Sequence, residues 1–221
     1  MTETTPSTGP GRPRDPDLET KLVDAAIDLF ADEGWAGFNF QALANRAGVG
    51  KPAVYRRWKT KEDVLISAFA ATDVPLDPID TGSIRDDLAT LARLVLQHQL
   101  SRRGLASLRM YVEAFTHPKL FAGIVESVFA QQVKAARTAV RRAIERGELA
   151  PGTSSTLVLD AIMGGVTAHV LSTPPHLRDT MIAGASAYPE QLVDLVLYGT
   201  PGLTAPEVTQ PVTARRLHSQ N

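Results

Sequence analysis

Apolar residues that recur every three or four positions constrain this chain more than any other feature of its sequence. The first such stripe consists of Leu22, Val23, Ala26, Ile27 and Phe30. Residues with this spacing lie on one face of an α-helix, and Gly34 follows them as a helix stop. No segment alternates between apolar and polar residues as a half-buried strand does. The sequence therefore predicts an all-α fold of about nine helices.

Glycine, proline and capping residues divide the helical pattern into short helices followed by longer ones. A short helix is predicted over about 40–47, with Asn39 as its N-cap. Pro52 opens a second short helix a few residues later, and Thr60 caps a third that has Asp63 in its first turn. The longer helices are predicted over about 84–100, 103–116, 118–146, 154–172 and 188–198.

The change in helix length predicts four regions along the chain. They are a flexible basic arm over 1–16, a domain of short helices over 17–74, a helical bundle over 75–200 and a flexible tail over 201–221. The break between the two folded parts is expected in the proline-containing segment 74–82. The arm and the tail are rich in Pro and Thr, which predicts little packed structure in either.

The composition excludes several classes of protein. The 221 residues carry 23 Lys+Arg and 24 Asp+Glu, a formal net charge of −1, and 43% of them are hydrophobic, which is a globular composition. The sequence contains no cysteine, which excludes disulfide scaffolds, thiolate zinc sites and thiol nucleophiles. The five histidines are scattered, and no catalytic triad or carboxylate pair stands out. We therefore expect no metal, no cofactor and no enzymatic activity.

Nothing in the sequence predicts secretion or a membrane span. The N-terminal residues lack the apolar core of a secretory signal. The most apolar stretch, over 157–171, is interrupted by Asp160 and His169 and is short for a membrane span. We therefore expect a cytoplasmic protein without a membrane partner.

Basic residues are concentrated in one short part of the chain. Between Gly34 and Lys61 there is no Asp or Glu. The basic residues of this segment are Arg46, Lys51, Arg56, Arg57, Lys59 and Lys61. The same segment contains two short helices joined by a tight glycine turn, with a third helix before them, which is a helix-turn-helix arrangement at about 40–59. A segregated basic face on a nearly neutral protein suits binding to DNA phosphates.

The second helix of this motif, the predicted recognition helix, sorts its residues by face. Val54 and Trp58 are four positions apart and are predicted to point into the core. Ala53, Arg56 and Arg57 share another face, which is predicted to point outward. A helix that presents small and arginine side chains can enter the major groove, where arginine binds guanine O6 and N7.

The run from Phe38 to Leu65 resembles the DNA-binding domain of the tetracycline-repressor (TetR) family of bacterial regulators. The preceding helix over 22–38, the Gly-Arg-Pro-Arg arm and the length of the chain also fit this family. The segments 113–129 and 141–149 look like one common version of the family's second domain. The resemblance implies an N-terminal helix-turn-helix domain of three helices and a C-terminal helical domain for ligand binding and dimerisation.

The resemblance assigns DNA contacts residue by residue. The residues that it implies are Asn39, Gln41, Lys51, Pro52, Ala53, Tyr55, Arg56, Arg57 and Lys61. Tyr55 can donate its hydroxyl to a phosphate, and Lys61 lies at a helix N-terminus, where backbone N–H groups also attract phosphate. Gly50 replaces a serine cap that is common in the family, and glycine is a tolerable cap. Arg12 and Arg14 could reach the minor groove or stay in solvent.

The helical bundle contains polar and aromatic residues that could line an effector pocket. These candidates are His98, Arg109, Tyr111, Glu113, Phe115, Phe129, Met163 and His169. Polar groups inside an apolar cage are how such pockets orient a ligand, although the same residues could equally serve packing. Because the bundle offers few candidate charges, we expect a largely apolar small-molecule effector.

Two helices of the bundle carry residues suited to a subunit interface. These candidates are Leu157, Ala161, Gly164, Gly165, Ala168, Leu192, Leu195 and Val196. Small residues permit close helix packing, and the resemblance implies that these two helices pair with their copies in a homodimer. A two-fold protein also matches a two-fold DNA site. The alternative is that the glycines pack within one subunit.

The sequence thus predicts a dimeric, sequence-specific transcriptional regulator of double-stranded DNA, most simply a repressor that a small molecule releases from a palindromic operator. An activator role also stays open. Two other classes remain as alternatives: a non-specific DNA-compacting protein, and a ligand carrier or enzyme with a vestigial DNA-binding head.

Overall fold

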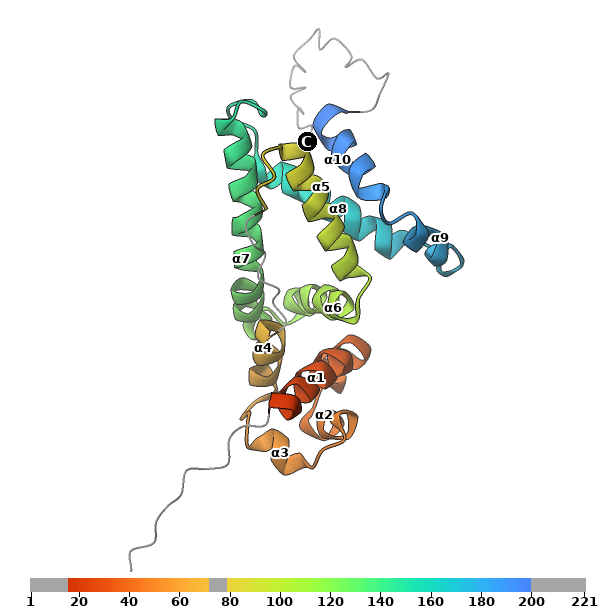
Figure 1. The fold of residues 1–221 in the computed structure, drawn as a ribbon. Helices are drawn as coiled ribbons and strands as arrows, with labels where there is room; N and C mark the ends of the chain where they lie inside the picture. Colours follow the sequence, from red (N-terminus) through yellow and green to blue (C-terminus); the bar gives the residue numbers. More distant parts are fainter. Residues whose placement is uncertain (1–15, 72–78, 200–221) are drawn as a thin grey trace, which may run out of the picture.

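The computed structural model describes residues 16–71 and 79–199 (Figure 1). The regular elements of these two ranges are all helical, which confirms the all-α prediction. They are α1 (Pro16–Gly37), α2 (Phe40–Ala47), α3 (Lys51–Tyr55), α4 (Lys61–Ala71), α5 (Ile84–Gln99), α6 (Arg102–Thr116), α7 (Pro118–Glu145), α8 (Ser155–Ser172), the 3-10 helix η1 (Pro175–Leu177), α9 (Arg178–Ala183) and α10 (Tyr188–Tyr198). Helix α9 was not predicted, because its six residues directly follow a proline-rich turn and are too few to show a helical period. Arg12 and Arg14 lie outside the described residues.

Local signals set the ends of the short N-terminal helices. Gly34 has φ 63° and ψ −165°, so it interrupts α1 three residues before the helix ends. Asn39 caps α2 as predicted, because its side chain accepts a hydrogen bond from the Ala42 backbone N–H (2.9 Å). Thr60 and Asp63 cap α4 reciprocally, each side chain accepting from the other's backbone N–H (3.1 and 3.0 Å).

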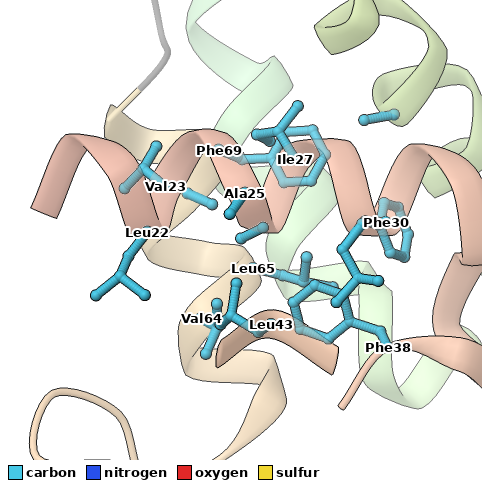
Figure 2. Close-up of a cluster of buried hydrophobic side chains, with 14 of the residues drawn as sticks. Leu22, Val23, Ala25, Ile27, Phe30, Phe38, Leu43, Val64, Leu65 and Phe69 are labelled. Atoms are coloured by element: carbon cyan, nitrogen blue, oxygen red, sulfur yellow. The ribbon is translucent and has the colours of Figure 1, made fainter. Parts of the chain in front are cut away.

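The first hydrophobic core lies among α1, α2 and α4, and it also includes residues from the C-terminal bundle. Figure 2 shows its side chains gathered around α1, with Phe30, Phe38 and Phe69 among them. Phe30 makes edge-to-face contacts with both of these rings at centroid distances of 6.2 Å. Ala106 and Met110 of α6 and Phe121 of α7 complete this core. The core therefore crosses the domain boundary that helix lengths alone suggest.

The second core lies among α5, α7, α8 and α10. Its fully buried members include Ala92, Val140, Ile162, Val166 and Val193. Helix α7 extends from the N-terminal helices to the far end of this bundle, and α6 lies between the two parts (Figure 1). Helix α7 therefore contributes to both cores, whereas α6 contributes to the first core alone.

The turn from α5 into α6 depends on a glycine. A Cβ atom at Gly104 would lie 2.0 Å from the backbone oxygen of His98 and 2.6 Å from the Cα atom of Gln99. No side chain fits at such distances. Ser101 then caps α6, since its hydroxyl accepts a hydrogen bond from the Gly104 N–H (3.1 Å). This close crossing sets the angle at which α6 leaves the bundle toward α1.

A buried carboxylate holds the chain where it enters α5. Asp87 is 1% exposed, and one of its oxygens accepts hydrogen bonds from the backbone N–H and the hydroxyl of Thr81, both 2.7 Å long. Its other oxygen lies 4.0 Å from the guanidinium of Arg142 and 3.9 Å from that of Arg146. Two cations beside a buried anion offset its desolvation, so this cluster ties the start of α5 to the end of α7.

Candidate nucleic-acid interface

Helices α2 and α3 are joined by a turn that two glycines permit. Gly48 adopts the left-handed conformation, φ 63° and ψ 38°, and its backbone N–H bonds to the end of α2. Gly50 then precedes α3 as its N-cap, and Pro52 stands in the first turn of that helix. The arrangement is the helix-turn-helix that the sequence predicts, and α3 occupies the position of the recognition helix.

Helix α3 ends at Tyr55, whereas the sequence analysis also assigned Arg56, Arg57 and Trp58 to faces of this helix. The turn continues beyond it, because the N–H of Trp58 donates to the carbonyl of Val54 (3.1 Å). Val54 is fully buried and Trp58 is 8% exposed, as predicted for the inward face. The Trp58 indole N–H donates to the hydroxyl of Ser67 in α4 (2.9 Å). The recognition helix is thus anchored to α4 from beneath.

The outward face of this segment is exposed and basic. Lys51, Pro52 and Arg56 are exposed, while Ala53 and Arg57 are half-buried. Arg57 donates from Nη1 to the carbonyl of Ala53 (3.2 Å), and its buried Nε has no hydrogen-bond partner among the described residues. A buried donor without a partner is costly, so an incoming acceptor such as a phosphate oxygen would stabilise it.

Tyr55 is held by a residue that the sequence reading did not single out. The ring of Tyr55 packs edge-to-face on Phe40 at the start of α2, with 4.7 Å between centroids. Tyr55 nevertheless remains 57% exposed. Two aromatic residues at facing ends of α2 and α3 were visible in the sequence, but their pairing depends on the turn geometry. The contact fixes the ring that would present its hydroxyl to a phosphate.

The two predicted contact residues of the α2 region are hydrogen-bonded to neighbouring residues of the chain. The amide nitrogen of Asn39 donates to the carbonyl of Gly37 (3.0 Å), while its oxygen caps α2. Gln41 donates to the side-chain oxygen of Asn45 one turn later (2.8 Å). Both side chains are therefore oriented before DNA arrives. Their part in DNA binding stays a prediction.

Lys61 faces Trp35 rather than open solvent. Its ammonium donates to the carbonyl of Trp35 (3.1 Å) and lies 3.6 Å from the centroid of the indole ring. Trp35 also donates its backbone N–H to Glu113 in α6 (3.0 Å) and packs edge-to-face on Phe121 in α7. Trp35 thus joins four helices directly after the break at Gly34. Its role was not apparent in the sequence, since a helix-terminal tryptophan reads as ordinary core.

The face of α1 that meets α6 is linked to it by charge. Arg109 of α6 donates to the carbonyls of Ala31 and Asp32, both at 2.7 Å. Asp32 also accepts from Arg46 of α2 (2.6 Å) and from Arg102 of α6 (2.5 Å). These hydrogen bonds, that of Arg46 first, hold the pKa of the Asp32 carboxyl below its usual value of 3.8.

Models of two protein families match the chain. The one described as "Bacterial regulatory proteins, tetR family" matches residues 22–68, which contain the helix-turn-helix. The one described as "Tetracyclin repressor-like, C-terminal domain" matches residues 78–196, more than half of the chain. The chain belongs to the TetR family. It is therefore a transcriptional regulator with a helix-turn-helix DNA-binding domain, and the matched families and relatives are regulators rather than enzymes.

Relatives of this TetR-family regulator are similar over most of its length. The HTH-type transcriptional regulator AqdR of Rhodococcus erythropolis is 31% identical over 180 residues, which cover 81% of this chain and 83% of AqdR. The uncharacterized HTH-type transcriptional regulator YdeS of Bacillus subtilis is 26% identical over 201 residues, 90% of this chain and 96% of YdeS.

Solved structures of TetR-like regulators share the fold. FadR from Bacillus subtilis, in complex with stearoyl-CoA, superposes with a TM-score of 0.66 at 18% identity and covers 82% of this chain and 99% of its own. The TetR family transcription regulator SCO0332 superposes with a TM-score of 0.56 at 25% identity, covering 83% of this chain and 98% of its own. The match extends over both the helix-turn-helix and the bundle of the TetR-family regulator.

The effector-pocket candidates on α6 divide between two faces of the helix. Arg109 and Glu113 are four positions apart and both contact α1, so they join the two parts of the molecule. Tyr111 and Phe115 are also four positions apart and lie on the other side of α6. Phe115 is 89% exposed, and burial raises the pKa of Tyr111 to about 12 although the residue remains 37% exposed. An effector beside α6 would meet the second pair rather than the first.

The remaining candidates lie on other helices. The ring of His98 in α5 is 3.1 Å from the hydroxyl of Ser107 in α6. His169 of α8 stacks on Tyr188 of α10 at a centroid distance of 3.8 Å, a packing contact between these helices. Met163 is half-buried in α8, and the side chain of Phe129 lies outside the described residues. A role for these four residues in effector binding stays a prediction.

The dimer candidates divide into an outer and an inner set. The side chains of Leu192 and Val196 pack on the second core, and a Cβ atom at Gly165 would lie 2.9 Å from Leu192. Gly165 therefore packs within the subunit, which was the alternative for the glycines. A Cβ atom at Gly164 would meet no atom within 4 Å. Exposed with it are Leu157, Ala168 and Leu195, while Ala161 is half-buried.

Helix α8 is unusually apolar for a helix with so much exposed surface. Among the described helices it alone has the length and apolar composition of a membrane span, with a mean hydropathy of 1.3. Only 17% of that stretch is buried within the subunit. Leu157 is 70% exposed and Leu171 is 64% exposed. A surface of this kind needs a partner in water.

Proposed function

We propose that this TetR-family regulator is a homodimeric repressor that binds a palindromic operator and is released from it by a small, largely apolar effector. The effector would enter the helical bundle and move α6 and α7. The DNA-binding head, which we define as α1 to α4, would move with them, and the spacing of the two recognition helices in the dimer would change. Operator and effector binding would then oppose each other by equal factors. The protein would act in the cytoplasm.

The observation that carries this proposal is the shared first core. Met110 and Phe121 come from the bundle, yet they are fully buried beside Phe30 of the head. Close-packed interiors transmit strain instead of absorbing it. A displacement of α6 or α7 therefore has to move α1 and α4. A vestigial head or an independent effector domain would not require this continuity.

The exposed surface of α8 supports the dimer. Leu157, Gly164, Ala168 and Leu171 follow each other at spacings of seven, four and three residues, which places them on one stripe. Leu195 and Tyr198 are exposed on the neighbouring α10. Two such helices and their symmetry copies would form a four-helix interface with small residues at the closest approach.

The first test is fluorescence anisotropy of the full-length protein with DNA from its own flanking intergenic region and with a scrambled control. Specific repression requires tight binding to the first DNA and a steep salt dependence, because phosphate contacts release counterions. Equal binding of both DNAs would instead support the DNA-compacting alternative. No binding at low salt would refute the proposal.

The second test is release of the bound DNA by a panel of apolar compounds. Stearoyl-CoA, which accompanies FadR in its solved structure, is one reasonable member of that panel. A true effector should weaken operator binding and should itself bind more weakly when operator is present, by the same factor. A compound that binds without changing operator affinity is not the effector.

A further inference from the structure

We propose that Asp32 is a positioning residue for DNA binding: it connects α6 of the effector bundle to α2 of the helix-turn-helix. This inference rests on the proposed function and names the route by which the two sites communicate. Asp32 is neither one of the predicted DNA-contact residues nor a member of the hydrophobic core. Its importance comes from three helices that converge on one carboxylate.

The two oxygens of Asp32 are taken by arginines from different parts of the molecule. Oδ2 accepts from Nη1 of Arg46 in the last turn of α2 (2.6 Å). Oδ1 accepts from Nη2 of Arg102 in the first turn of α6 (2.5 Å). The carboxylate therefore bridges α2 and α6, with one oxygen bound to each helix. Arg46, one of the six basic residues between Gly34 and Lys61, is thereby turned toward α1.

The bridge is part of a longer row of ion pairs along α1. Arg102 also reaches Asp28 through Nε (3.2 Å), and Arg103 pairs with Asp24 (3.1 Å). The three aspartates are four positions apart and so lie on one side of α1. We call the row formed by Asp24, Asp28, Asp32, Arg102 and Arg103 the charge row.

The helix that supplies the arginines gains nothing from them locally. Arg102 and Arg103 occupy the first turn of α6, and no acidic residue accompanies them there. The N-terminus of a helix carries partial positive charge, so two arginines at this position are unfavourable for α6 alone. They become favourable only when α1 presents its aspartates. The two arginines therefore stabilise the one position of α6 relative to α1 in which their ion pairs can form.

The charge row is suited to switching. Its side chains keep 38–54% of their surface exposed, so water competes with each pair. The bonds to Asp32 are short, and a relative shift of α1 and α6 by about 1 Å would bring them to the limit of hydrogen bonding. A small movement of α6 would therefore release Asp32, and with it the restraint on Arg46. A buried hydrophobic contact would not respond so sharply.

The test uses the full-length protein and DNA from its own flanking intergenic region. Hydrogen exchange of the α6 amides is measured with and without this DNA, and the dissociation constant is measured by anisotropy. In the wild-type protein, DNA should slow exchange in α6, although this helix lies on the far side of α1 from α3. Asp32→Asn should remove most of this slowing and weaken DNA binding by about fivefold or more.

Three further variants separate coupling from simple loss of structure. Asp32→Glu keeps the charge and should largely restore the α6 response. Arg102→Gln removes the partner on α6, away from the DNA face, and should reproduce Asp32→Asn with little added effect in the double variant. Glu145→Gln removes an exposed ion pair with Arg141 within α7 and should change nothing.

The outcomes distinguish the inference from the proposed function. If the wild-type protein binds the DNA and Asp32→Asn retains the full α6 response, the inference is wrong while the repressor proposal stands. The same conclusion follows if Arg102→Gln behaves as the wild type does. If the wild-type protein binds no DNA at low salt, the proposed function fails, and the inference fails with it.

Discussion

Truncating Phe121 should destabilise the DNA-binding head, although Phe121 belongs to the bundle by sequence. The residue is fully buried, and its ring lies 5.1 Å from that of Trp35 and 6.1 Å from that of Phe30. A buried phenylalanine replaced by alanine costs about 3–5 kcal/mol. Because the whole free energy of unfolding of a domain is about 5–15 kcal/mol, this loss is a large fraction of it.

Urea denaturation followed by tryptophan emission measures this effect selectively. The chain has two tryptophans, Trp35 and Trp58, and both lie in the head. Their emission therefore reports unfolding of the first core, while far-ultraviolet circular dichroism reports all helices. With a slope of about 1–3 kcal/mol per molar urea, Phe121→Ala should lower the tryptophan midpoint by roughly 1–5 M.

Ile162→Ala is the matched control in the second core. Ile162 is also fully buried, and its truncation costs about 2–5 kcal/mol. Protein concentration is held constant, since a dimer's stability depends on it. We expect Phe121→Ala to lower the tryptophan midpoint more than Ile162→Ala does. A midpoint unchanged by Phe121→Ala, with a loss visible only by circular dichroism, would refute the shared core.

Four further outcomes are expected. Arg56→Ala should cost about 1–3 kcal/mol at particular operator bases and little at others, which anisotropy with base-substituted DNA would reveal. Gly104→Ala should destabilise the fold by about 3 kcal/mol or more in thermal melts, because the added carbon would collide with the His98 carbonyl. Leu157→Glu should leave the subunit folded but monomeric by sedimentation, since the residue is 70% exposed. Because the pKa of Asp32 is lowered in the folded protein, the stabilisation from its charge is fully present above pH 3.8 and is lost as the pH falls through the folded-state pKa. Between pH 5 and pH 3, Asp32→Asn should therefore lose less stability than the wild type does. Urea midpoints measured at both pH values would show this.

Most helix ends were predictable because their causes are local. The Asn39 cap of α2, the reciprocal cap of Thr60 and Asp63, and the left-handed Gly48 each act within about four residues of chain. The basic segment and the inward Val54 were equally readable, since helical periodicity determines which residues share a face. These features also carried the family resemblance.

The candidate effector and dimer residues were less predictable, because their roles depend on which helix lies opposite. Gly164 and Gly165 are adjacent in the sequence and chemically identical. One is open to solvent and the other packs against Leu192, 27 positions away in the chain. Arg109 and Glu113 were expected near an effector, but in the structure they contact the end of α1. Helical periodicity predicts which face of a helix each residue lies on, but it does not predict which other helix packs against that face.

The sequence by itself determined most of the helices and their caps, the helix-turn-helix and the basic surface of the recognition segment, because each follows from interactions between residues a few positions apart. Only the tertiary structure decided that Phe121 completes the head's core, that Lys61 rests on Trp35, and that Asp32 joins α2 to α6. Those contacts join residues that are far apart in the sequence: 14 positions separate Asp32 from Arg46, 70 separate it from Arg102, and 91 separate Phe30 from Phe121. Their formation depends on how the helices pack together, and a single sequence carries no direct record of that packing.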